Sequence, residues 1–261
     1  MDAITVVLAS HNRLAFLQSA LESVWAQDYP RMEVLVVDDG SEEETRAWLA
    51  SEEKQQARLQ VHFQQQSGVG EARRMGVILA RTPLITILDS DDLLACGALT
   101  RIGEFMEQNP EVDLLYGDIE TYRSDGHRSR RKYRQWGSNQ SMQWATLLLP
   151  KLPFKHSGTS FRREIALEVG NYDGSLGRKI DIDFFLKFLT QGKKLAYLGG
   201  KPLVIFHMHG ESISRNRVAG LNEWRVIMDR YAPGGPLGWS FRVIRTMSEL
   251  LKSVYEKVLV R

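Results

Sequence analysis

Residues 84–92 read LITILDSDD, an apolar run followed directly by three acids in four positions. A short apolar run of this length, rich in β-branched residues, is typical of a buried strand. The acids then place carboxylates at the point where the strand ends. The segment therefore predicts a strand that carries Asp89, Asp91 and Asp92 to one edge of a sheet.

The chain before this segment repeats the pattern. Apolar runs at 4–9 and 33–37 and an alternating segment at 59–63 predict three more strands, and the second of them ends at Asp38-Asp39-Gly40-Ser41. Helical spacing separates the strands, at 14–27, 42–56 and 71–80. Strands that alternate with helices predict βαβ units and a largely parallel α/β sheet. Because ligands bind outside the carboxyl ends of such strands, both acidic clusters are expected at the binding edge.

The two acidic clusters each allow two interpretations. Asp89, Asp91 and Asp92 suit a hard divalent cation, which prefers oxygen ligands, but Asp is also common in turns and helix caps. Asp39 can accept a hydrogen bond from the imide N–H of a pyrimidine base or from a sugar hydroxyl. The alternative for Asp39 is a simple Asp-Gly turn.

Three further groups of residues are candidates for a site. Gly68 and Gly70 open a helix that could hold phosphate, although their spacing is not that of a dinucleotide fingerprint. Asp181 begins the helical segment 181–191, where helix capping is the default explanation. His207 and His209 follow strand-like residues and share one strand face. None of these groups identifies a reaction by itself.

Composition excludes several classes of protein. The 261 residues suffice for one core-bearing domain with an appendage, and the single cysteine, Cys96, permits neither an internal disulfide nor a cysteine-based zinc cluster. The first residues predict no signal peptide, and no apolar run is long enough for a membrane span. Residues 1–214 carry a net charge of −3 and residues 215–261 one of +5. A slightly acidic body argues against a nucleic-acid-binding protein.

The second half of the chain is less regular. Residues 112–116 and 201–206 resemble strands, 123–134 reads as an exposed loop or hairpin, and 135–160 shows no period. After a turn-rich linker at 233–238, an apolar stripe opposes a charged face, which predicts an amphipathic helix. Three partners are open for this helix: its own domain, a second subunit in a homodimer, or an anionic membrane. The stripe comprises Val243, Met247, Leu250, Val254 and Val258, and the charged face Arg242, Arg245, Glu249, Lys252 and Glu256.

Taken together and in order, seven segments resemble glycosyltransferase family 2, the inverting GT-A-fold enzymes that use nucleotide sugars. The resemblance covers about residues 3–215. It implies a Rossmann-like, mixed and mainly parallel sheet flanked by helices, with a domain at 1–215 and a C-terminal helical extension at 216–261. The segments are VVLASHNR, SALESVWAQDYP, VLVVDDGS, SGVGEARRMGVILARTPLITILDSDD, VGNYDGSL, DIDFFLKFLTQG and FHMHGESIS.

The resemblance also implies roles for single residues. Asp181 matches the catalytic base, which takes the proton of the acceptor hydroxyl. Asp91 and His209 match positions at the metal, which would be Mn²⁺ or Mg²⁺. The positions that match donor nucleotide binding are Ala9, His11, Asp39, Arg73 and Asp89.

The implied activity is the metal-dependent transfer of a sugar from a nucleoside diphosphate sugar, with UDP as the expected nucleotide, to a carbohydrate or glycolipid acceptor. Such a hexosyltransferase is expected in the cytoplasm, with peripheral contact at the inner face of the membrane, in polysaccharide or glycolipid synthesis. Two departures from the family pattern motivate an alternative, a non-catalytic nucleotide-sugar-binding partner or scaffold. Ile180 stands where the family usually has Glu, and His11 stands where it often has Tyr. A magnesium-dependent phosphotransfer or dinucleotide enzyme is a third hypothesis, disfavoured because the chain lacks a P-loop lysine.

Overall fold

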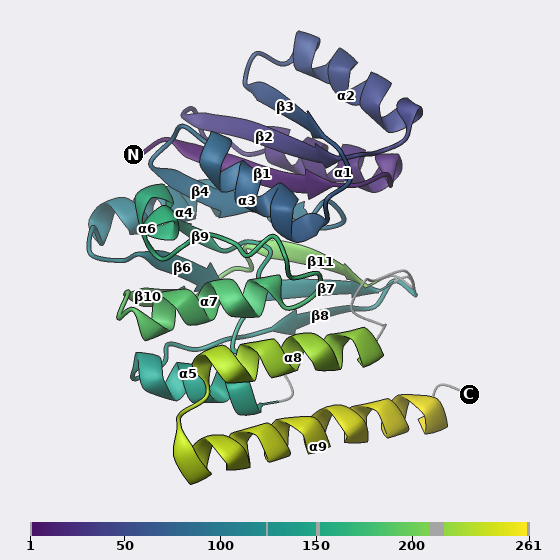
Figure 1. Cartoon of the computed structure of the whole chain (residues 1–261). Helices are drawn as coiled ribbons and strands as arrows, with labels where there is room; N and C mark the ends of the chain where they lie inside the picture. Colours follow the sequence, from purple (N-terminus) through teal and green to yellow (C-terminus); the bar gives the residue numbers. More distant parts are fainter. Residues whose placement is uncertain (1, 124, 150–151, 209–216, 260–261) are drawn as a thin grey trace.

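The computed structural model describes residues 2–123, 125–149, 152–208 and 217–259, apart from the side chains of 208, 217–221 and 252–259. Its main feature is a seven-stranded sheet (Figure 1). The strands of this sheet are β1 (Ile4–Ser10), β2 (Met32–Asp39), β3 (Leu59–Gln64), β4 (Leu84–Ile87), β6 (Leu114–Gly117), β9 (Ser160–Arg162) and β10 (Leu195–Leu198). Their order is β10-β6-β9-β4-β1-β2-β3.

The sheet is mainly parallel. β1 pairs in parallel with β2 and β4, β2 with β3, and β10 with β6, whereas β9 runs antiparallel between β4 and β6. The four strands predicted in the first ninety residues are all present, within two residues at each end. The mixed, mainly parallel sheet is therefore confirmed.

Helices cover both faces of this sheet, and the alternation of β1 shows how. Val7 contributes to one hydrophobic cluster, while Val6 and Leu8 contribute to the cluster on the other side. On the side of Val7 lie α3 (Val69–Leu79), α5 (Asn139–Leu148), α6 (Arg163–Glu168) and α7 (Ile180–Thr190). On the other side lie α1 (Leu14–Trp25), α2 (Glu43–Gln55) and α4 (Ala98–Gln108).

A second, four-stranded sheet has the order β5-β11-β7-β8. Of the two alternatives for 123–134, a loop or a hairpin, the structure shows a hairpin, since β7 and β8 pair antiparallel, but its first strand begins before that segment. This sheet was not predicted, because its strands are short and one of them has only two residues. Its members are β5 (Leu93–Leu94), β7 (Ile119–Arg123), β8 (Arg128–Arg131) and β11 (Val204–Met208).

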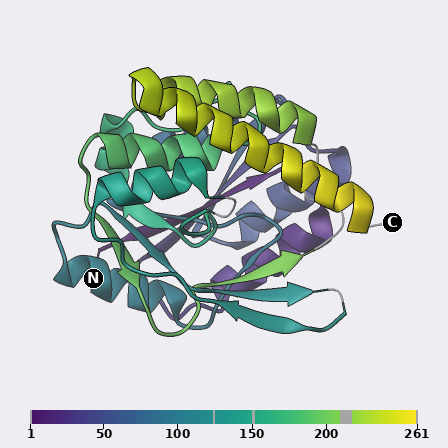
Figure 2. The same ribbon diagram turned by 90° about the horizontal axis from the view of Figure 1, so that it is seen from below.

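The C-terminal part forms two helices, α8 (Arg217–Tyr231) and α9 (Gly235–Leu259). They lie beside α5 and α7 as the outermost layer (Figures 1 and 2). Trp224, Ile227 and Phe241 from this pair belong to the same hydrophobic cluster as α7. No helix in the described part of the chain is long and apolar enough to cross a membrane.

The amphipathic helix is confirmed, but its packing differs from the simplest expectation. Arg245, assigned to the charged face, is 5% exposed, and Met247, assigned to the apolar stripe, is 54% exposed. The guanidinium of Arg245 lies 3.5 Å from the ring centroid of Trp224, and its pairing with Glu249 satisfies its charge. The charged face therefore packs on the domain, and the apolar stripe points outward.

Candidate active site

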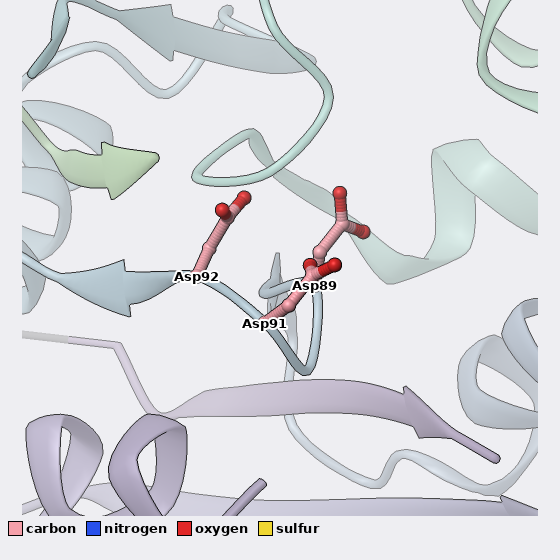
Figure 3. A group of neighbouring side chains, drawn as sticks. All are labelled: Asp89, Asp91 and Asp92. Carbon is pink, nitrogen blue, oxygen red and sulfur yellow. The ribbon is translucent and has the colours of Figure 1, made fainter. Parts of the chain in front are cut away.

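The acidic loop between β4 and β5 lies where β1, β2 and β4 end. Asp89, Asp91 and Asp92 each direct a carboxylate from this one loop (Figure 3). One ligand oxygen from each of them lies within 4.8 Å of the others. Three carboxylates so close repel one another unless positive charge lies among them. The loop therefore has the ligand chemistry of a site for a hard divalent cation.

Asp92 is the most buried member of the cluster, with no exposed surface. Its Oδ1 accepts a hydrogen bond from the backbone N–H of His207, 3.2 Å away. Its Oδ2 is buried and has no hydrogen-bond partner among the described residues. Burial raises the pKa of Asp92 well above its usual value, and the charges of Asp89 and Asp91 add to the rise. A bound cation would supply the missing partner for Oδ2.

Asp89 has positive neighbours. Its Oδ1 lies 2.5 Å from an Nη of Arg73, and its backbone N–H donates to the Oγ of Ser157 over 3.2 Å. Burial alone would raise the pKa of Asp89, but Arg73, His156 and Lys155 outweigh it and hold that pKa well below its usual range. Asp89 is therefore ionised, and Arg73 fixes its position.

Asp91 is held by the loop after β1. An Nη of Arg13 lies 3.2 Å from its Oδ2, and Nδ1 of His207 lies 3.2 Å from its backbone oxygen. Asn12 and Arg13 both have positive φ angles, 56° and 58°, which cost energy in residues other than glycine. The Asn12 N–H donates to the Oγ of Ser41 over 2.7 Å, and this bond ties the strained loop to the end of β2.

The donor-binding candidates on β1 and β2 also lie together. Nδ1 of His11 is 2.9 Å from the backbone oxygen of Asp39, and Ala9 pairs with Val37 across the two strands. The carboxylate of Asp39 accepts hydrogen bonds from the backbone N–H groups of Ser67 and Gly68, at 2.7 and 2.8 Å. Oδ1 of Asp39 also accepts a hydrogen bond from Nε2 of Gln64 over 2.7 Å. Asp39 thus shapes the turn that begins α3, and its Oδ2 can still accept one further donor from a ligand.

Asp181 lies in the first turn of α7. Burial lowers the pKa of His156, and the charge of Asp181 opposes that shift; the same charge adds to that of Asp89 in raising the pKa of Arg73, which places Asp181 in the electrostatic environment of Asp89. Among the described residues, no hydrogen bond reaches the carboxylate of Asp181. Asp183, two residues later, is fully buried and accepts hydrogen bonds from Arg230 and Tyr231.

A contact from α8 fixes the backbone that leads to Asp181. The carboxylate of Glu223 accepts hydrogen bonds from the backbone N–H groups of Gly177, Arg178 and Lys179, over 3.2, 2.8 and 2.8 Å. These N–H groups lie just before α7. At the start of a helix, backbone N–H groups have no partner within the helix and need another acceptor. The C-terminal helical pair therefore holds the start of the helix that carries Asp181.

The structure brings together most of the residues that the sequence singled out. The acidic loop contains Asp89 and Asp91. Near it lie Arg73, which pairs with Asp89, and Asp181. The ends of the neighbouring strands carry Ala9, His11 and Asp39. His209 falls outside the described residues. Sequence reasoning missed Arg13, Glu223, Lys155 and His156. The last two belong to a loop without any period, so the sequence carried no signal for them.

The sequence was compared with known protein families and with individual proteins. The sequence profile described as Glycosyl transferase family 2 matches residues 5–170. Glycosyltransferase GlyG of Streptococcus pneumoniae is 28% identical over 128 residues, which is 48% of this chain and 42% of GlyG. The amylovoran biosynthesis glycosyltransferase AmsE of Erwinia amylovora is 24% identical over 270 residues, 98% of each chain. The chain thus spans less than half of GlyG and nearly all of AmsE.

Solved structures show the same fold. Staphylococcus aureus TarS 1-349 in complex with UDP-GlcNAc has a TM-score of 0.71 at 17% identity, over 99% of this chain and 76% of that one. The mannosyltransferase PcManGT of Pyrobaculum calidifontis, in complex with GDP-Man and Mn²⁺, has a TM-score of 0.67 at 16% identity, with the same coverage. The expected GT-A fold is therefore confirmed.

Proposed function

The chain belongs to glycosyl transferase family 2, and from that premise we propose that it is a metal-dependent, inverting hexosyltransferase. Its donor is a nucleoside diphosphate sugar, with uridine diphosphate as the nucleotide, and its acceptor is a hydroxyl of a carbohydrate or glycolipid. The observation that carries the proposal is the convergence of Asp89, Asp91 and Asp92 in one loop, together with Asp181 in the first turn of α7, whose charge acts on Arg73 beside Asp89. A cation site beside a carboxylate that can accept a proton suits this reaction.

The reaction is a single displacement. The carboxylate of Asp181 takes the proton of the acceptor hydroxyl while that oxygen attacks the anomeric carbon. The bond from the anomeric carbon to the diphosphate oxygen breaks, and the nucleoside diphosphate leaves with the electron pair. Attack opposite the leaving group inverts the anomeric carbon, so the chain needs no nucleophilic side chain.

Asp91 and the neighbouring carboxylates of Asp89 and Asp92 would hold the metal, with His209 as a further ligand. When bound, Mn²⁺ or Mg²⁺ would offset the charge that develops on the diphosphate. The donor set supports this assignment, since all three groups are hard oxygen ligands and Asp92 Oδ2 is buried without a partner among the described residues.

The nucleotide would lie at the ends of β1 and β2. Ala9, His11 and Asp39 would contact its base and ribose, and the imidazole of His11 offers a flat surface for stacking. Arg73 would act mainly by orienting Asp89, because the two side chains are paired and Arg73 is only 13% exposed. The contact of His11 with Asp39 supports a shared role for these two residues.

For the acceptor, we propose the polysaccharide or glycolipid class, in line with AmsE, the similar glycosyltransferase of amylovoran biosynthesis. We place the reaction in the cytoplasm, at the inner face of the membrane. A single cysteine suits a reducing compartment. We also propose the division into a transferase domain, 1–215, and a helical extension, 216–261.

A non-catalytic nucleotide-sugar-binding protein is the second candidate, and Ile180 favours it. Ile180 is 1% exposed and belongs to the hydrophobic core, so it contributes no second acid beside Asp181. Such a protein would bind the donor and leave it intact. The two candidates therefore differ in turnover and agree in binding.

A donor screen tests the proposal. Thermal unfolding of the chain with UDP, GDP and dTDP sugars, each with and without Mn²⁺, should show a rise in Tm for one nucleotide that requires the metal. Release of the free nucleotide from that donor in the presence of polysaccharide or glycolipid acceptors then separates an enzyme from a binding protein. No rise in Tm with any nucleotide sugar, with or without Mn²⁺, would contradict both candidates, and a rise that does not need Mn²⁺ would contradict the metal-dependent transferase.

A further inference from the structure

The helix α9 has two faces of opposite character, and the polar one is buried. Arg245 packs against the ring of Trp224, lies 3.0 Å from Glu249, and donates a hydrogen bond to the backbone oxygen of Leu149 over 2.7 Å. Phe241, one turn earlier, is 4% exposed. These contacts fix the rotation of α9 about its own axis.

The outward face of α9 is apolar. Seven large apolar side chains between residues 237 and 251 are 39–69% exposed, and the described part of the chain has only five other exposed side chains of this kind. At 100° per residue the seven occupy an arc of about 160°. Single exposed apolar residues are ordinary, but a contiguous patch marks an interaction surface. The patch, called here the α9 face, comprises Leu237, Trp239, Val243, Ile244, Met247, Leu250 and Leu251.

Arginines adjoin the α9 face. A crevice of about 270 Å³ separates α8 from α9, and its charged lining is Arg225, Arg242 and Arg245 together with Asp229 and Glu249. Arg242 pairs with Asp229 and Arg245 with Glu249, so Arg225 is the positive charge in excess. Thr246, which also lines the crevice, lies next to Trp239 and Leu250 around the helix. The sequence continues the basic character, because residues 215–261 carry nine basic and four acidic side chains. The α9 face is therefore apolar, and the segment that carries it has a net positive charge.

The charge decides between the two occupants that an apolar helix face can have. In a symmetric dimer the same patch meets itself, so two segments of net positive charge would approach each other. An anionic lipid surface instead offers apolar chains to the α9 face and negative headgroups to Arg225 and to the net positive charge of residues 215–261. A helix with this pattern lies in the plane of the membrane interface, and exposed Trp is common at that depth.

We propose that the α9 face docks the protein on a lipid bilayer that contains anionic phospholipid, with α9 parallel to the bilayer plane. The outermost position of α9 leaves this face open to a flat surface (Figures 1 and 2). The docking is independent of the transfer reaction. For a glycolipid acceptor of the kind given under the proposed function, it would hold the enzyme at the surface where that acceptor resides.

Flotation of the full chain with vesicles tests the docking. One set of vesicles contains phosphatidylcholine alone, and the other contains an equimolar mixture with phosphatidylglycerol. The wild type should float with the mixed vesicles and bind the neutral ones more weakly, and salt should weaken the binding. The double variant Ile244→Gln/Leu251→Gln should bind about tenfold more weakly, because it loses apolar contacts worth at least two methylene groups.

The double variant has a matched control. Ile78→Gln/Leu167→Gln changes two side chains that are 38% and 37% exposed on α3 and α6. Because all four positions are exposed and Gln favours helices, both variants should unfold near the wild-type temperature. The control should float like the wild type. Quenching of Trp239 by brominated lipid, absent in Trp239→Phe, should show directly that this face enters the bilayer.

Three outcomes would overturn the proposal. The wild type could fail to float with mixed vesicles, or the double variant could float as well as its control. The wild type could also be a dimer by light scattering that Ile244→Gln/Leu251→Gln converts to a monomer, which would make the α9 face a subunit interface. Donor binding measured without vesicles is independent of all three, so failure of docking stays distinct from failure of the proposed function.

Discussion

Glu223→Ala removes the acceptor for three backbone N–H groups just before α7. Two of the hydrogen bonds are 2.8 Å long and one is 3.2 Å. Hydrogen bonds to a charged group contribute about 1.5–3 kcal/mol each, but water partly replaces a lost cap, for which about 0.5–2 kcal/mol is typical. We therefore expect a loss of about 2–3 kcal/mol in the free energy of unfolding, or about 6 °C in Tm.

The activity should change in a specific way. Since α7 carries Asp181, a loose helix start displaces the proposed base, whereas the donor site at the ends of β1 and β2 keeps its own contacts. The kcat for transfer should fall by about tenfold or more, with a small change in the KM for the donor. Thermal unfolding and steady-state kinetics measure the two effects.

Two variants serve as controls for Glu223→Ala. Glu223→Gln keeps one acceptor oxygen and should recover part of the lost stability. Glu168→Ala breaks a surface ion pair with Lys193, 2.6 Å long, in which Glu168 is 58% exposed, and should cost less than about 1 kcal/mol. If Glu223→Ala unfolds and turns over like the wild type, the assigned role of Glu223 is wrong.

Three further predictions concern the body of the protein. Asp118→Asn should cost about 2–3 kcal/mol at neutral pH, because buried Asp118 loses its charge beside Arg130. Burial acts to raise the pKa of Asp118, but its hydrogen bonds outweigh burial and lower that pKa below 3.8. The stability that Asp118 contributes is therefore present above pH 3.8 and is lost as the pH falls below this value. Equal urea midpoints for Asp118→Asn and wild type at pH 7 would refute the prediction. Gly158→Ala should cost about 2–3 kcal/mol, since Gly158 has φ +85° and a Cβ would collide with Val204; an unchanged Tm would contradict the assignment. Asp91→Ala should abolish the effect of Mn²⁺ on UDP affinity in calorimetry, and a wild type that binds UDP equally with and without Mn²⁺ would argue against the cation site.

The sequence predicted the first half of the fold well for a local reason. Each of the strands at 4–9, 33–37 and 84–88 is a short apolar run followed at once by polar residues, so both its type and its end are encoded in neighbouring residues. The helix α5 was missed because its start is a Ser138–Ser141 capping box, and the sequence signature of such a box is Glu or Gln at the fourth position.

What the sequence could not predict depends on contacts between distant segments. The apolar stripe of α9 was visible, but which face packs inward depends on Trp224, which stacks on Arg245. In the site, Asp183 is a buried anchor for Arg230, and Glu223 reaches the start of α7 from another helix. A residue pattern shows whether a helix face is apolar or charged, but it does not show which segment that face packs against.

The central claim is that Asp181 is the base of a sugar transfer, and Asp181→Asn tests it most directly. Asn keeps the size of the side chain and removes its capacity to accept a proton. With the donor that stabilises the wild type, the variant should bind that donor within about threefold of the wild-type affinity and lose a factor of about 10²–10⁴ in kcat. Wild-type turnover by Asp181→Asn would contradict the account.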